Sequence, residues 1–195
     1  MTATDDTATA PATELLGPLA PLVGEWEGDE GVDTAFAHDQ GGVIDTPYRE
    51  RLSLTPFGPV ANGRQVLYGL DYRTAMWKAG DPIPFHTEVG YWLWDAATGE
   101  VLRGFVVPRG IAVLAGGTAT ADATTLTMRA AAGDPRYAIG ENAYLADHAA
   151  SLSFEITITI GSTGWSYDQV TMLRMSNLPD LLPHADRNSL RRVGS

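Results

Sequence analysis

The segment SLSFEITITI, residues 151–160, decides the fold class of this chain. Apolar side chains occupy every second position from Leu152 to Ile160, and serine, threonine and glutamate stand between them. Successive side chains of a β-strand point to opposite faces, so this alternation predicts a strand with one buried and one solvated face. The turn GSTG at 161–164 follows, and residues 165–175 are expected to pair back as the second strand of a hairpin.

Short strands separated by turn signals are expected along most of the chain. The further predicted strands are residues 48–55, 65–74, 85–94, 100–107, 111–114, 118–120 and 125–130. Eight to ten such strands with little helix are typical of an all-β sandwich or a closed antiparallel β-barrel. Closure removes exposed strand edges, and a barrel of about ten strands is wide enough to hold a ligand.

The remaining segments are predicted as helix or loop. Leucines at helical spacing in residues 14–23 indicate a short N-terminal helix, which Pro18 and Pro21 keep to a turn or two. The acidic, glycine-rich stretch 29–42 is predicted as a mobile loop, and 131–148 as a loop with a short helix. We expect residues 1–12 to be a disordered leader and residues 13–195 to form a single β-barrel domain.

Composition excludes several classes of function. The 195 residues carry a formal net charge of −11, which disfavours nucleic acid and anionic membrane surfaces as partners. The chain has no cysteine, so disulfides, thiolate metal sites and cysteine nucleophiles are absent. It shows neither a membrane span nor a secretory signal pattern, and we therefore expect a cytoplasmic protein.

The segment FHTEVGYWLW, residues 85–94, has no cleanly polar face. His86, Glu88, Trp92 and Trp94 share one face of the expected strand, while Tyr91 lies on the other. A histidine and a glutamate beside tryptophans indicate either the wall of an enclosed site or a core strand whose histidine is hydrogen-bonded.

Few residues stand at spacings that indicate catalysis. The four histidines, His38, His86, His148 and His184, form no metal-binding motif, and no nucleophile elbow, phosphate loop or dinucleotide fingerprint appears. A single imidazole can still ligate the iron of a haem. His184 follows a proline in a short polar segment after the last expected strand, where a surface histidine is the alternative reading.

Several elements together resemble the nitrobindin family. They follow in the family's order from about residue 15 to 193, and the His-x-Glu-x-Gly-Tyr-Trp element at 86–92 is the most specific of them. The matching elements are LAPLVGEWEG at 19–28, YRE at 48–50, PFHTEVGYW at 84–92, Gly110-Ile111, Gly116, Arg174-Met175, Pro183-His184 and Leu190.

The resemblance implies a ten-stranded antiparallel barrel shaped like the fatty-acid-binding proteins and other calycins. It also implies ferric haem b bound near one barrel end, nitric oxide binding, isomerisation of peroxynitrite to nitrate, and a homodimer. By position, His184 would be the axial ligand of the haem iron and His86 would stand on the distal side. Trp26, Tyr91 and Trp92 would be further cofactor-binding residues.

Two departures from the family pattern leave alternatives open. The acidic stretch before Tyr48 is an insertion, and Leu190 lies one position further from His184 than in the family. Aligned on Leu190 without a gap, Ala185 takes the ligand position, and alanine cannot bind iron. The chain is therefore either a haem barrel or a haem-free carrier or sensor of a fatty acid or another small apolar ligand. A third reading has tryptophans filling the cavity and a protein that works through its surface.

Overall fold

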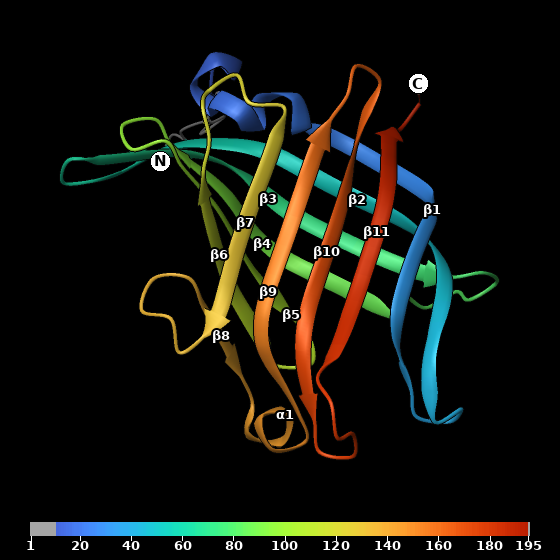
Figure 1. The fold of residues 1–195 in the computed structure, drawn as a ribbon. Helices are drawn as coiled ribbons and strands as arrows, with labels where there is room; N and C mark the ends of the chain where they lie inside the picture. Colours follow the sequence, from blue (N-terminus) through green and yellow to red (C-terminus); the bar gives the residue numbers. More distant parts are fainter. Residues whose placement is uncertain (1–10, 195) are drawn as a thin grey trace, which may run out of the picture.

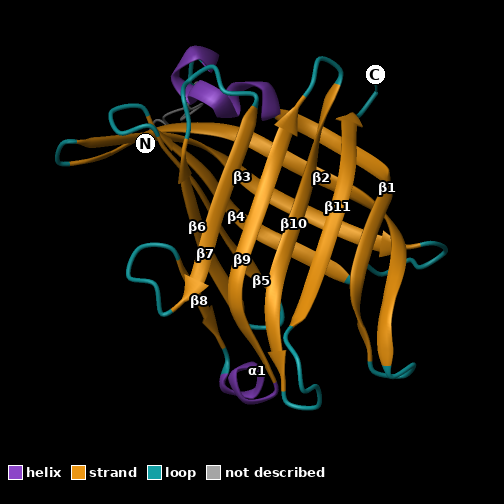
Figure 2. Cartoon of the chain, in the orientation of Figure 1, coloured by secondary structure: helices purple, strands orange, loops and turns teal. Residues whose placement is uncertain are grey.

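The computed structural model describes residues 11–194, which form a β-barrel with helices only at its two ends (Figure 1, Figure 2). None of the helices in this range is long and apolar enough to cross a membrane. The 3₁₀ helix η1 (Thr13–Leu22) and the α-helix α1 (Ala143–His148) accompany eleven strands. The strands are β1 (Gly24–Ala37), β2 (Gly42–Asn62), β3 (Gln65–Lys78), β4 (His86–Asp95), β5 (Glu100–Val107), β6 (Ile111–Thr118), β7 (Thr125–Ala132), β8 (Ala138–Glu141), β9 (Ala149–Ile160), β10 (Gly164–Met175) and β11 (Leu182–Arg192).

The barrel closes because β1 pairs with both β2 and β11. Around the wall the order is β1-β11-β10-β9-β7-β8-β6-β5-β4-β3-β2. The predicted all-β closed barrel with a short N-terminal helix is confirmed, but it has eleven strands and is mixed. The difference comes from β8, which inserts between β6 and β7 and pairs parallel to β7. A four-residue strand inside a stretch without clear periodicity leaves no signal in the sequence.

Two segments expected outside the strands are part of the wall. Residues 29–37 continue β1 and pair with β2 from Gly31↔Tyr48 to Ala37↔Gly42, so the mobile-loop prediction is wrong there. Gly31 is needed for close approach, because a Cβ at this position would lie 2.4 Å from the Tyr48 ring. The segment after the expected last strand is β11, which places His184 in a strand. The expected leader falls almost wholly outside the described residues and stays a prediction.

The helix η1 lies across one end of the barrel (Figure 1). Leu16, Leu19 and Leu22 are fully buried against the core. The indole Nε1 of Trp26 donates a hydrogen bond to the Leu22 carbonyl at 2.7 Å, which ties the end of the helix to β1. The helix kinks at Gly17, whose φ of 51° is open to glycine and rarely to other residues.

Replacing Gly17 with alanine is expected to lower the free energy of unfolding by about 2–3 kcal/mol. The backbone at residue 17 has a positive φ, which is strained for alanine. The added Cβ would also lie 2.4 Å from the Trp94 indole nitrogen. Gly41→Ala is the matched control, because Gly41 has a φ of 66° but nothing within 4 Å of the added Cβ. Urea unfolding monitored by tryptophan fluorescence measures both, and equal losses would show that Trp94 does not constrain the kink.

Candidate functional site

The end of the barrel opposite η1 contains a cavity of about 830 Å³. Its walls come from most strands, from the β1–β2 turn and from α1. The apolar lining includes Phe105, Val113, Phe154, Leu173 and Leu182. The volume lies within the range of small-molecule and cofactor sites, so the third reading, a barrel filled by its own tryptophans, does not describe this half of the molecule.

His86 faces this cavity from β4 and is held by Glu88. Its Nε2 lies 3.1 Å from Glu88 Oε1, while Glu88 Oε2 is 2.6 Å from Arg103 Nη2 and accepts from Tyr72 at 2.8 Å. Burial alone would raise the Glu88 pKa, but Arg103 and His86 outweigh it and bring the pKa to about 2. Burial would lower the His86 pKa, and Glu88 outweighs it, so this pKa is raised. Glu88 is therefore an anion that favours the cationic form of His86.

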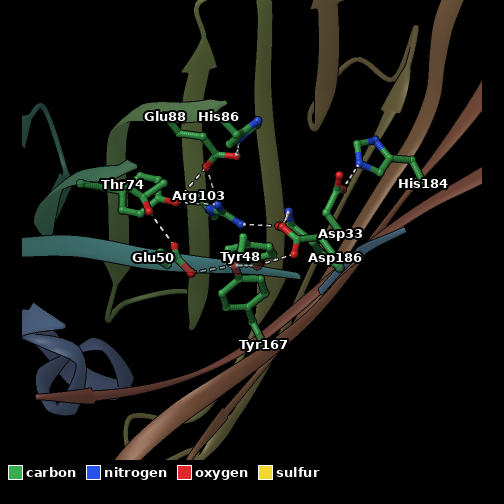
Figure 3. A network of polar contacts seen from close by, with 12 residues as sticks. Asp33, Tyr48, Glu50, Thr74, His86, Glu88, Arg103, Tyr167, His184 and Asp186 are labelled. Carbon is green, nitrogen blue, oxygen red and sulfur yellow. Dashed lines mark hydrogen bonds and ion pairs between the residues drawn. The ribbon is translucent and has the colours of Figure 1, made fainter. Parts of the chain in front are cut away.

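A chain of hydrogen bonds continues from Arg103 across the floor of the cavity (Figure 3). Arg103 Nη1 donates to Gln169 Oε1 at 3.2 Å, and Gln169 Nε2 donates to Asp186 Oδ2 at 3.1 Å. Asp186 also accepts from the Tyr48 hydroxyl. Burial raises the Asp186 pKa to about 7, with a further contribution from Glu50. Asp186 thus exchanges a proton near neutral pH at the floor of the cavity.

The chain ends at Glu50, which is fully buried in the barrel. The Glu50 carboxyl accepts from Thr74 at 2.6 Å and from Tyr167 and Asn188 at 2.9 Å each. Tyr167 is also 2.7 Å from the Tyr48 hydroxyl, which links Glu50 to Asp186. Burial raises the Glu50 pKa despite these hydrogen bonds. We call the connected residues His86, Glu88, Tyr72, Arg103, Gln169, Asp186, Tyr48, Tyr167, Glu50, Thr74 and Asn188 the floor network.

His184 lies on β11 and lines the same cavity. Figure 3 shows its ring beside Asp33. Its Nε2 lies 2.6 Å from Asp33 Oδ1 on β1, and 37% of its side chain is exposed. The fold therefore brings His86 and His184, almost a hundred positions apart in the chain, to one cavity. Between residues 11 and 194, no group of three or more His, Cys, Asp or Glu side chains could hold a metal ion.

Trp26, Tyr91 and Trp92 do not line the cavity. Tyr91 is 52% exposed on the outer face and packs on Phe57 at 5.3 Å, because strand alternation turns it away from His86. Trp26 and Trp92 are buried in the aromatic core around Trp165, with each ring centroid 6.1 Å from that of Trp165. Their predicted role as cofactor-binding residues stays a prediction, and none of the three side chains lines the cavity.

Sequence reasoning missed most of the floor network. On β2, Glu50 points inward between the buried Tyr48 and Leu52. On β5, Arg103 points inward between the buried Val101 and Phe105. A charged residue in the apolar phase of a strand is the signal that marks both of them. Asp33 and Asp186 gave no comparable signal.

A closed barrel with a partly apolar cavity and a hydrogen-bonded polar floor is typical of small-ligand-binding proteins. The chain matches the family model described as the THAP4-like, heme-binding beta-barrel domain over residues 15–192. It therefore belongs to this family, the nitrobindin family that its sequence elements resemble.

Two individual proteins show how far the similarity reaches. A peroxynitrite isomerase of Clavibacter michiganensis subsp. michiganensis is 37% identical over 79 residues, which are 40% of this chain and 34% of that protein. The match thus spans about a third of that relative's length. The crystal structure of Rv2717c from M. tuberculosis superposes with a TM-score of 0.60 at 19% identity and covers 91% of this chain and 96% of that one. It shares the barrel fold.

Proposed function

We propose that the cavity binds ferric haem b, with His184 as the axial ligand and His86 on the distal side. The observation that carries the proposal is the pairing of His184 with Asp33 in the cavity wall. Metal-binding histidines commonly engage a carboxylate through one ring nitrogen, which orients the ring and makes the ligand more basic. Asp33 takes Nε2, and Nδ1 has no hydrogen bond within residues 11–194, so a ring nitrogen is available.

The rest of the cavity fits the same cofactor. Apolar side chains such as Phe105 and Phe154 suit a porphyrin face, and Lys78 and Arg109 among the lining residues suit its propionates. Bound ferric haem supplies an iron that takes nitric oxide or peroxynitrite. His86, whose cationic form Glu88 favours, would donate a hydrogen bond to an anionic ligand in the cavity. Peroxynitrite isomerisation is the activity we propose for the haem-loaded protein.

His184→Ala is expected to weaken binding of added hemin by on the order of 100-fold, because the protein then contributes no ligand to the iron. Hemin titration followed at the Soret band measures the affinity. His148→Ala is the control, since His148 is exposed on α1 and does not line the cavity. A Soret band of unchanged position and affinity in His184→Ala would remove His184 as the ligand.

The second candidate is a haem-free carrier or sensor of a fatty acid or similar apolar ligand. It is favoured by the apolar part of the cavity lining, which includes Val113, Leu173 and Leu182. Native mass spectrometry of the purified protein separates the two functions. A bound lipid, together with no Soret band after hemin is added to the delipidated protein, would support the carrier and contradict the haem proposal.

A further inference from the structure

Three buried N–H groups have no hydrogen-bond partner among the described residues. They are Trp92 Nε1, Trp165 Nε1 and Arg103 Nε. The three residues are 1%, 4% and 3% exposed, so bulk water does not reach them. All three line one small void of about 10 Å³ in the core, beside the cavity. Unpartnered donors are rare in protein interiors, and three around one void call for a specific cause.

Ring contacts bring Trp92 together with the other two side chains. The Trp92 and Trp165 ring centroids are 6.1 Å apart at an interplanar angle of 72°, and Arg103 Cζ lies 5.4 Å from the Trp92 ring. The other nitrogens of Arg103 are already used, Nη1 by Gln169 and Nη2 by Tyr72 and Glu88. Nε is therefore the one guanidinium nitrogen without a hydrogen-bond partner among the described residues.

The polar neighbours of the void are committed elsewhere. The Tyr72 hydroxyl donates to Glu88 and accepts from Arg103, and the Tyr167 hydroxyl donates to Glu50. Gln169 Oε1 accepts from Arg103. The remaining lining residues are Leu52, Met76, Ile156 and Ile158, which carry no oxygen or nitrogen in their side chains. None of these oxygens is a hydrogen-bond partner of the three N–H groups, so an acceptor in the void would come from outside the chain.

We propose that this void is a binding site for one hydrogen-bond acceptor with a single heavy atom, a water molecule or a chloride ion. The volume matches one water-sized particle, which excludes carboxylates, phosphates and organic ligands. Three donors without a partner favour a particle that accepts, and the guanidinium of Arg103 tolerates one that is negative. The site is separate from the ligand cavity and does not depend on haem binding.

The occupant would also brace the cavity floor. Met76 and Gln169 line both the void and the ligand cavity. A particle bound to Trp92, Trp165 and Arg103 holds the guanidinium in place on its inner side, while Glu88 and Gln169 hold it on the other nitrogens. The site thus holds the Arg103 guanidinium in place. This guanidinium is connected to His86 through Glu88 and to Asp186 through Gln169.

The indole N–H signals of ¹⁵N-labelled protein without haem test the proposal. The protein is placed in acetate buffer, an anion too large for the void, and rotating-frame NOE spectra are recorded at the water frequency. Sodium chloride then replaces sodium acetate at constant ionic strength. Trp92→Phe and Trp165→Phe assign the two signals, and Trp26, whose Nε1 donates to Leu22, is the internal control.

A bound water gives direct dipolar cross-peaks to both Trp92 and Trp165 and none to Trp26. A bound chloride gives saturable shifts of both Trp92 and Trp165 signals, while Trp26 stays fixed. Either result supports the site and identifies its occupant. Cross-peaks or shifts at neither indole, or at only one of them, would overturn the shared site. The wild-type spectrum carries the test even where a tryptophan variant fails to fold, because a signal that disappears in one variant suffices for assignment.

Discussion

Glu88→Gln is expected to lower the free energy of unfolding by about 3–5 kcal/mol, the usual loss when one member of a buried ion pair is removed. Glu88 and Arg103 are each 3% exposed and lie 2.6 Å apart. His86 also loses its anionic partner in this variant, but an imidazole can release its proton. Arg103 cannot, since a guanidinium stays charged in proteins, so an uncompensated cation remains in the core.

A double variant separates the charge effect from lost packing. Arg103 Cζ lies between 4.6 and 5.8 Å from the rings of Phe105, Tyr72, Trp92 and Phe154, a cage in which a methionine side chain can pack. Glu88→Gln with Arg103→Met removes both charges and should recover most of the loss. Glu155→Gln is the exposed control, because Glu155 and its partner Arg129 are 50% and 66% exposed and should contribute less than about 1 kcal/mol. Urea unfolding at pH 7 gives all values, and equal losses for Glu88→Gln and Glu155→Gln would contradict the buried-pair account.

The sequence predicted the parts of this protein that depend on local alternation. The hairpin of β9 and β10 and the inward position of His86 follow from a period of two, which burial of one face imposes. The same period, applied strictly, places Tyr91 outside. The acidic stretch 29–37 misled the prediction because composition indicates a loop, whereas pairing with β2 satisfies its backbone regardless of composition.

The contacts that make the site are long-range and leave no local pattern. Asp33 and His184 meet because β1 pairs with β11 and closes the barrel, with Thr34 opposite Ala185. Asp186 reaches Tyr48 across the same closure. Alternation can show that a charged residue such as Arg103 points inward. Only the register of the closed barrel shows that Glu88 and Gln169 accept its hydrogen bonds. Register between the chain's ends is a property of the whole sheet.

The second large effect concerns Asp186, the carboxyl at the floor of the cavity. Its pKa of about 7 lies roughly three units above the ordinary value near 4, because the charged form is buried. Between these two pH values the folded protein holds a proton that the unfolded chain has released. The contribution of Asp186 to the free energy of unfolding is fully present below about pH 4 and is lost as the pH rises through about 7. Three units correspond to a loss of up to about 4 kcal/mol.

Asp186→Asn removes this titration and keeps the contacts. The asparagine oxygen can accept from Gln169, and its amide can donate to the Tyr48 oxygen when the Tyr48 hydroxyl donates to Tyr167 instead of to residue 186. At pH 4.5 the haem-free variant should be about as stable as the wild type, and at pH 8 it should be more stable by up to about 4 kcal/mol. Because Glu50, Glu88 and His86 remain in both proteins, the difference between the two urea unfolding curves isolates Asp186.

Asp168→Asn, on the exposed outer face of β10, should have the same stability as the wild type at both pH values. A stability difference for Asp186→Asn that stays constant from pH 4.5 to 8 would mean that Asp186 is already ionised in the folded protein at low pH, and that the floor network holds a charge rather than a proton.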